Sequence, residues 1–212
     1  MKEILKISPS DIEKKSFEII SNELGERTFD KLQEPIIKRV IHTTADFDYA
    51  DTLTFGNDAV NSALDAIKSG CTIVTDTQMA KSGINKAAAA KFGCEVLCFM
   101  SDEDVKLSAK ENGTTRAYAS MDKASTIENA IFAVGNAPTA LIRLYELIGE
   151  GRISPKLIVG VPVGFVNVEA AKELIISTDV PHIVARGRKG GSNVAAAIIN
   201  ALLYMLDETR GG

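Results

Sequence analysis

Short apolar runs alternate with longer amphipathic stretches from residue 72 onward, and this alternation limits the possible folds more than any other feature. The apolar runs cover 72–75, 95–100, 131–134, 157–161 and 182–185. Stretches with helical periodicity cover 85–92, 139–148, 168–177 and 192–206. Strands that alternate with helices form right-handed crossovers and a parallel sheet covered on both faces. We therefore expect an α/β protein with a flavodoxin-like, three-layer α/β/α fold and a parallel sheet of about five strands.

Helices are expected before this alternation. The sequence Ser10-Asp11-Ile12-Glu13 has the capping-box pattern, in which a serine hydroxyl and a glutamate carboxylate satisfy free amide groups at a helix start. The apolar stripe that follows includes Ile12 and Ile20, and Ser16 falls on that stripe. The first helix is thus predicted to begin at Ser10 and to place Ser16 toward its neighbour.

Two further helices follow in the N-terminal part. One is predicted over 29–42, with Pro35 kinking or restarting it. The next is predicted from about Asn57, with Gly70 as its C-terminal stop. The sequence has no repeat or obvious linker, and at 212 residues it fits one domain, 1–212.

The composition excludes several classes of protein. With 45% hydrophobic and 25% charged residues, the chain matches a soluble globular protein with a real core. A net charge of −4 argues against non-specific nucleic-acid binding. No apolar run reaches the roughly 18 residues that span a bilayer, and the N-terminal stretch lacks the apolar segment of a signal peptide. We expect a cytoplasmic protein with neither a nucleic-acid nor a membrane partner.

Three cysteines, Cys71, Cys94 and Cys98, lie in apolar surroundings. Cys94 and Cys98 are four residues apart in a predicted strand, which places both on one side. A metal pair is conceivable, but no second cluster of histidine or cysteine completes four ligands. Buried, reduced thiols are the favoured interpretation, and no metal site is expected.

The loops after the predicted strands are where a ligand is expected, because open parallel sheets bind ligands beyond the carboxyl ends of their strands. In the loop 135–140, Asn136 suits a helix cap and Pro138 suits a first helical turn. The loop 160–165 ends in Gly164-Phe165, which either offers a flat wall to a ligand or packs in the core.

The loop 186–192 is the most informative of these loops. It combines Arg186, Arg188 and Lys189 with three glycines just before a helix, an arrangement that favours anion binding. It matches neither the Walker spacing nor G-x-G-x-x-G. A tight strand-to-helix turn with solvated charges is the alternative interpretation.

Arg39 and His42 lie three residues apart, so they share one face of a helix or its last turn. An imidazole gives or takes a proton near neutral pH, and an adjacent arginine holds a carboxylate in a fixed orientation. The alternative is that His42 only interacts with the last helical carbonyls. Spacing alone leaves both possibilities open.

Four sequence blocks, "RVIH" at 39–42, "GNAPTAL" at 135–141, "GVPVGFV" at 160–166 and "RGRKGGS" at 186–192, are similar to those of one enzyme family. Together with "IEKKSFEII" at 12–20, these blocks show that the chain resembles precorrin-8X methylmutase over nearly its whole length. That enzyme also exists as cobalt-precorrin-8 methylmutase. The resemblance implies a flavodoxin-like homodimer that moves a methyl group to the adjacent carbon at ring C of a corrin macrocycle. The product in cobalamin (vitamin B12) biosynthesis is hydrogenobyrinic or cobyrinic acid. No added cofactor is implied, and cobalt enters only as part of the substrate.

The resemblance also implies site residues. His42 matches the catalytic histidine of the family, while Ser16 and Arg39 match substrate-contacting residues. A proton placed on or near a ring nitrogen helps a methyl group to migrate, and His42 is the expected donor and acceptor. The substrate carries several carboxylates, for which the further candidates are Arg39, Arg116, Arg186, Arg188 and Lys189. For Arg116 a plain surface cation is an equal alternative.

Two other functions remain possible from the sequence. A phosphate-dependent enzyme would use the 186–192 loop as an anion cradle, whereas a tetrapyrrole carrier would bind without conversion. For His182, which follows Pro181 at a strand start, a structural role is favoured. The acidic residues between Asp46 and Asp51 indicate an acidic loop more than a metal site. Thr43 and Thr44 have no assigned role.

Overall fold

The computed structural model describes residues 8–207, and within them six strands and eleven helices alternate along the chain. The strands are β1 (Leu53–Gly56), β2 (Thr72–Thr75), β3 (Glu95–Leu97), β4 (Ala130–Val134), β5 (Leu157–Gly160) and β6 (His182–Ala185). The helices before β3 are α1 (Pro9–Leu24), α2 (Glu34–Thr44), α3 (Tyr49–Thr52), α4 (Ala59–Lys68), α5 (Gln78–Gly83) and α6 (Lys86–Lys91). Those after β3 are α7 (Glu103–Glu111), α8 (Arg116–Ala124), α9 (Pro138–Gly149), α10 (Val168–Ile176) and α11 (Ser192–Leu206).

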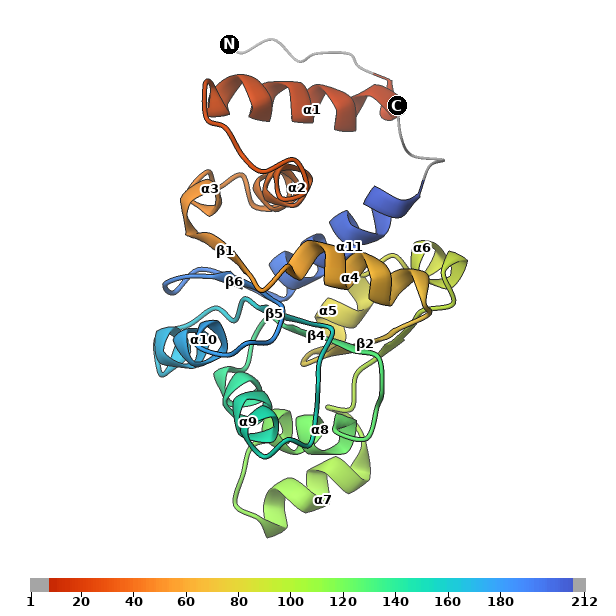
Figure 1. Cartoon of the computed structure of the whole chain (residues 1–212), viewed down its shortest axis with the longest axis vertical. Helices are drawn as coiled ribbons and strands as arrows, with labels where there is room; N and C mark the ends of the chain where they lie inside the picture. Colours follow the sequence, from red (N-terminus) through yellow and green to blue (C-terminus); the bar gives the residue numbers. More distant parts are fainter. Residues whose placement is uncertain (1–7, 208–212) are drawn as a thin grey trace.

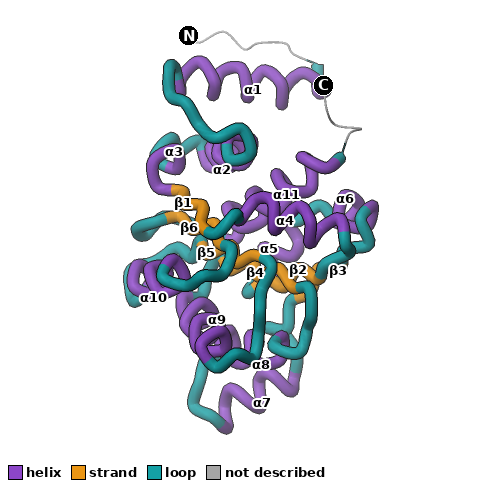
Figure 2. Tube along the Cα trace, viewed as in Figure 1, coloured by secondary structure: helices purple, strands orange, loops and turns teal. Residues whose placement is uncertain are grey.

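The strands form one sheet in the order β1-β6-β5-β4-β2-β3, whose edge-on course is clear in Figure 2. The five strands β2 to β6 are parallel, and their order is that of flavodoxin-like sheets. The predicted fold class is therefore confirmed. The structure adds β1, which pairs antiparallel with β6 from Leu53 opposite Ala185 to Gly56 opposite His182.

Alternate residues of the central strands point into two separate cores. Ile131 and Ala133 belong to the core covered by α2, α4, α6 and α11, whereas Phe132 and Val134 belong to the core covered by α8, α9 and α10. Figure 1 shows these helices on opposite faces of the sheet, with α2 and then α1 stacked outside α11. Burial on both faces explains why the strands read as continuous apolar runs.

The ends of several elements differ from the sequence-based expectation. Helix α1 begins at Pro9 with Ser8 as its N-cap, so the predicted N-cap at Ser10 is wrong by two residues. The predicted contact of the Ser10 side chain lies outside the described side chains. The helix predicted over 29–42 begins only at Glu34, because residues 29–33 are not helical; Pro35 therefore stands in its first turn, and neither a kink nor a restart occurs there. Helix α4 begins only at Ala59 because Asn57 and Asp58 have left-handed backbones.

The cysteines are free and buried, as expected. Strand β3 is shorter than predicted, so Cys94 and Cys98 flank it rather than belong to it. The Sγ atoms of Cys71 and Cys94 lie 3.6 Å apart, and burial raises the pKa of the Cys71 thiol. Among residues 8–207 no three histidine, cysteine or acidic side chains gather as metal ligands would, and no helix has the length and apolar character to cross a bilayer.

Candidate active site

The carboxyl edge of the parallel strands gathers the segments that carry the candidate residues. The loops after β4, β5 and β6 all end there, and the antiparallel β1 begins at the same edge. The N–H of Arg186 donates to the carbonyl of Thr52 at 2.9 Å, which joins the loop after β6 to the chain that follows α2. One edge of the sheet therefore carries the glycine-rich loop and the end of the His42 helix.

Arg116 also begins its helix at this edge. It is the first residue of α8, and the hydroxyl of the preceding Thr115 lies 2.8 Å from that of Thr139, at the start of α9. Helix α8 lies on the opposite face of the sheet from α1 and α2 (Figure 1). Arg116 is thus placed at the same edge as His42 but on the other side of the sheet.

His42, Phe17 and Arg39 form a stack between α1 and α2. The rings of His42 and Phe17 are stacked with centroids 5.3 Å apart and an interplanar angle of 16°. The guanidinium carbon of Arg39 lies 4.8 Å from the centroid of the same Phe17 ring. The predicted shared face of Arg39 and His42 is confirmed, and Phe17 is a site residue that the sequence did not single out.

Arg39 has further partners that fix its orientation. Its guanidinium pairs with Glu13 and lies 5.2 Å from the ring centroid of Tyr204 on α11. His42, by contrast, is exposed, and its imidazole makes no hydrogen bond to any residue between 8 and 207. Ser16 is half-buried, and its hydroxyl donates to the carbonyl of Ile12 at 2.9 Å. Ile12 itself is exposed, so the predicted apolar stripe is wrong at that residue. The imidazole is therefore held by its face and open at its edge, which carries both ring nitrogens.

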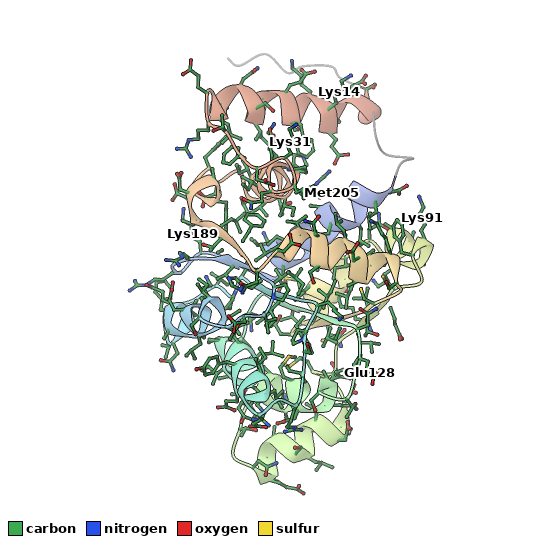
Figure 3. The ribbon with its side chains drawn as sticks, in the orientation of Figure 1. Lys14, Lys31, Lys91, Glu128, Lys189 and Met205 are labelled. Carbon is green, nitrogen blue, oxygen red and sulfur yellow. The ribbon has the colours of Figure 1, made fainter. Side chains whose placement is uncertain are left out.

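A groove of about 1160 Å³ opens between α1, α2 and α11 beside this stack. Phe17 and Tyr204 give its wall two rings, and its charged lining is mixed: three cations, Lys14, Lys38 and Arg39, and three glutamates, Glu13, Glu18 and Glu34. Figure 3 shows two of its lining residues, Lys14 on α1 and Met205 on α11. Lys38 pairs with Glu34 and Arg39 with Glu13, so the rings rather than a net positive charge distinguish this groove.

Each cation of the 186–191 loop is paired with a carboxylate. Arg188 Nε donates to Glu169 Oε1 at 2.8 Å, and Arg186 lies 3.8 Å from Glu173. Lys189, near α3 and β1 in Figure 3, contacts Asp46 at 2.6 Å and Asp48 at 2.5 Å.

The bonds to Lys189 explain the acidic residues that follow α2. The hydrogen bond from Lys189 holds the pKa of Asp46 below its usual value, and the two aspartates raise the pKa of Lys189. Asp51 pairs instead with Arg27. These residues tie the turn after His42 to the glycine-rich loop, as an acidic loop would. Thr43 and Thr44 donate to helical carbonyls, which leaves their roles open.

The glycine-rich loop packs closely on the loop after β5. A Cβ added to Gly190 would lie 2.1 Å from the carbonyl oxygen of Val161, so no larger residue fits there without a backbone shift. Phe165 is 84% exposed, with the Arg188 guanidinium carbon 5.6 Å from its ring centroid. Core packing of Phe165 is thereby excluded, and its ring is available as a surface wall.

Asp76 supports the loop after β4, and the sequence reading missed it. Its buried carboxylate accepts the N–H groups of Gly135 at 2.9 Å, Asn136 at 2.8 Å and Ala137 at 2.7 Å. Burial raises the pKa of Asp76, and the three N–H donors oppose that effect. The predicted cap by Asn136 is wrong, because α9 has Ala137 as its N-cap and no side-chain cap. Pro138 is in the first turn, as predicted.

His182, the other histidine, has a different environment. It is buried, and its Nδ1 lies 2.9 Å from the carbonyl oxygen of Val180. A Cβ on the facing Gly56 would lie 2.2 Å from the imidazole, so the ring fills that space. This arrangement agrees with the structural role favoured by the sequence.

Comparison with known proteins decides the family. The family model described as precorrin-8X methylmutase matches residues 11–205. The chain belongs to the precorrin-8X methylmutase family. A cobalt-precorrin-8 methylmutase from Salmonella typhimurium is 50% identical over 207 residues, covering 94% of this chain and 97% of the relative. One of the same name from Leptospira interrogans is 44% identical, covering 95% of each chain.

A solved structure agrees with this assignment. The crystal structure of precorrin-8X methylmutase from Thermus thermophilus superposes with a TM-score of 0.85 at 39% identity, covering 92% of this chain and 96% of the other. Methylmutases are isomerases of cobalamin biosynthesis, so the resemblance seen in the four motifs and the predicted enzyme class are confirmed.

Proposed function

We propose that this methylmutase moves the methyl group at ring C of its corrinoid substrate through proton transfer by His42. The observation that supports the proposal most is the stack of His42 on Phe17, with Arg39 on the same ring. An imidazole held by its face and exposed at its edge is suited to donate a proton to a ring nitrogen and to take it back. The reaction is intramolecular, so no atom is gained or lost.

The residues around His42 are proposed to bind and orient the macrocycle. Arg39 is fixed between two rings and offers its guanidinium to a substrate carboxylate. Ser16 lies one residue before Phe17 and is proposed to contact the substrate through its hydroxyl. Arg116, Arg186 and Arg188 are proposed to receive further carboxylates along the same edge of the sheet.

Reversing the charge at Arg188 tests the proposed anion role of the loop. Arg188→Glu is expected to raise the substrate dissociation constant about tenfold or more, because it removes one ionic partner and adds repulsion. Binding is measured by titrating the chain with the coloured substrate. Arg152→Glu, on the segment before β5, changes the charge equally and is expected to leave binding unchanged. Equal affinities for wild type and Arg188→Glu would remove the anion role.

The preferred substrate is proposed to be the cobalt form, cobalt-precorrin-8, with cobyrinic acid as its product. Both relatives described above, at 50% and 44% identity, are named for the cobalt form. The metal-free alternative, precorrin-8X, gives hydrogenobyrinic acid. When both substrates are supplied at equal concentration, we expect the cobalt form to be consumed faster. Faster loss of the metal-free form would reverse this assignment.

Three further properties are proposed with this function. The methylmutase works without an added cofactor, since a methyl shift within one molecule needs no redox partner. It acts as a homodimer, as the resemblance implies. It works in the cytoplasm, a location that suits three free cysteines.

A further inference from the structure

Lys172 on α10 is a buried ammonium group that the proposed chemistry does not use. Its side chain is 0% exposed. Its Nζ donates to the carbonyl oxygens of Gly187 at 2.7 Å and of Lys189 at 2.8 Å. An apolar side chain of similar length would fill the same space without the desolvation of a charge. The two hydrogen bonds are therefore the distinctive contribution of a lysine at this position.

These bonds set the direction of the peptide groups in the 186–191 loop. In a trans peptide the N–H points opposite to the C=O, so the N–H groups of Arg188 and Gly190 are directed away from Lys172. Neither N–H donates to an acceptor within residues 8–207. Two N–H groups without an acceptor, on a glycine-rich loop that also carries three cationic side chains, are donors available to an anion.

The same helix holds the loop at two more points. Glu169 and Glu173, one turn before Lys172 and directly after it, pair with Arg188 and Arg186 respectively. Both pairs are largely exposed, so they are readily exchanged for other carboxylates. The bonds from Lys172, in contrast, are shielded from water and stay in place while a ligand replaces the outer partners.

We propose that Lys172 is a positioning residue, which holds the 186–191 loop so that the N–H groups of Arg188 and Gly190 face a carboxylate of the substrate. This inference rests on the proposed function, because it takes the ligand to be the carboxylate-bearing corrinoid. Lys172 acts through the loop and does not touch the substrate.

Lys172→Met removes the charge and both hydrogen bonds while keeping the volume. The dissociation constant or KM for the substrate is expected to rise about tenfold, with kcat within about twofold of wild type. Resistance to denaturant at pH 7 is expected to change little, because relief from burying a charge offsets the loss of the two hydrogen bonds. A residue needed only for folding would instead lower stability and leave the affinity of the folded fraction unchanged. Lys156→Met, on the opposite edge of the sheet, is the charge-matched control.

The pH dependence of binding gives a second measurement on the wild type. Among charged groups, Glu169 on α10 acts on Lys172 and raises its pKa, Glu173 follows it in the chain, and the loop whose carbonyls it contacts carries Arg186, Arg188 and Lys189. The residues of α9 and β6 in the adjoining core are apolar. Burial lowers the pKa of Lys172 to about 8, whereas the pKa of Lys189 is raised by its two aspartates. When Lys172 loses its proton, its hydrogen bonds to the two carbonyls lose their charge assistance and weaken. Substrate affinity should therefore fall between pH 7 and pH 9, and Lys172→Met should lack that fall.

The outcomes separate the two proposals. If the wild type neither binds nor converts corrinoids, the proposed function fails. The positioning role is then tested by backbone NMR of the 186–191 loop. Its order parameters should be about 0.85 in the wild type and below about 0.6 in Lys172→Met. If the wild type converts its substrate, unchanged affinity in Lys172→Met overturns the inference. A loss of kcat without a change in KM also overturns it. If Lys172→Met does not fold, the wild type alone gives the test: a substrate affinity that stays constant between pH 7 and pH 9 overturns the inference.

Discussion

His42→Ala is expected to lower kcat by about 10² to 10⁴-fold, the usual contribution of a positioned general acid or base. The imidazole is exposed at its edge and stacked on Phe17, so its removal takes away the proton donor without opening the core. Substrate affinity should change little, because Arg39 and the cationic loop remain. Turnover is followed by the absorbance change of the corrinoid, and affinity by titration.

The same variant distinguishes catalysis from a role in the helix end. As a residue in the last turn of α2 whose ring stacks on Phe17, His42 contributes about 1 kcal/mol of stability. Lys68→Ala removes a cation from the last turn of α4, far from the stack, and serves as the control. Both variants should unfold within about 1 kcal/mol of wild type. Normal turnover by His42→Ala would show that the imidazole has only the structural role.

Asp76→Ala is expected to lower the free energy of unfolding by about 3 kcal/mol or more. It removes the one acceptor shared by the N–H groups of Gly135, Asn136 and Ala137, and hydrogen bonds to a charged group contribute about 1.5–3 kcal/mol each, without full additivity. Asp76→Asn retains one oxygen but turns an amide donor toward these N–H groups, so an intermediate loss is expected. Denaturation in urea measures both.

An exposed aspartate gives the control for this effect. Asp65→Ala removes a surface carboxylate that pairs with Lys68 at 3.6 Å, and a change within about 0.5 kcal/mol is expected. If Asp76→Ala and Asp65→Ala were equally stable, the buried carboxylate would not be holding the loop after β4.

Most strands of the parallel sheet were predictable from the sequence because each is marked by a short apolar run of its own. β2, β4, β5 and β6 are continuous apolar runs, since both faces of each are buried. β1 has no such signal: its four residues are only half-buried, and it becomes a strand by pairing with β6 at the sheet edge. Pairing with a segment more than 120 residues away leaves no trace in local periodicity.

The candidate site was predictable in part for the same reason. Arg39 and His42 lie on one helix, so their spacing of three residues already placed them together. Phe17, Asp76 and Lys172 escaped because their partners come from other elements: α2 for Phe17, the loop after β4 for Asp76 and the loop after β6 for Lys172. No local pattern marked Lys172, because it stands next to Glu173 in an amphipathic stretch where a lysine is ordinarily exposed.

The most direct test of the account is the fate of the substrate on the purified wild-type chain. The chain is mixed with an equal amount of cobalt-precorrin-8 or precorrin-8X, and the released pigment is examined by absorbance and mass spectrometry. The account predicts a changed spectrum at unchanged mass, because a methyl group moves within one molecule. Release of the original pigment after binding would identify a carrier instead, and a changed mass would identify a different reaction; either result would contradict the isomerase mechanism.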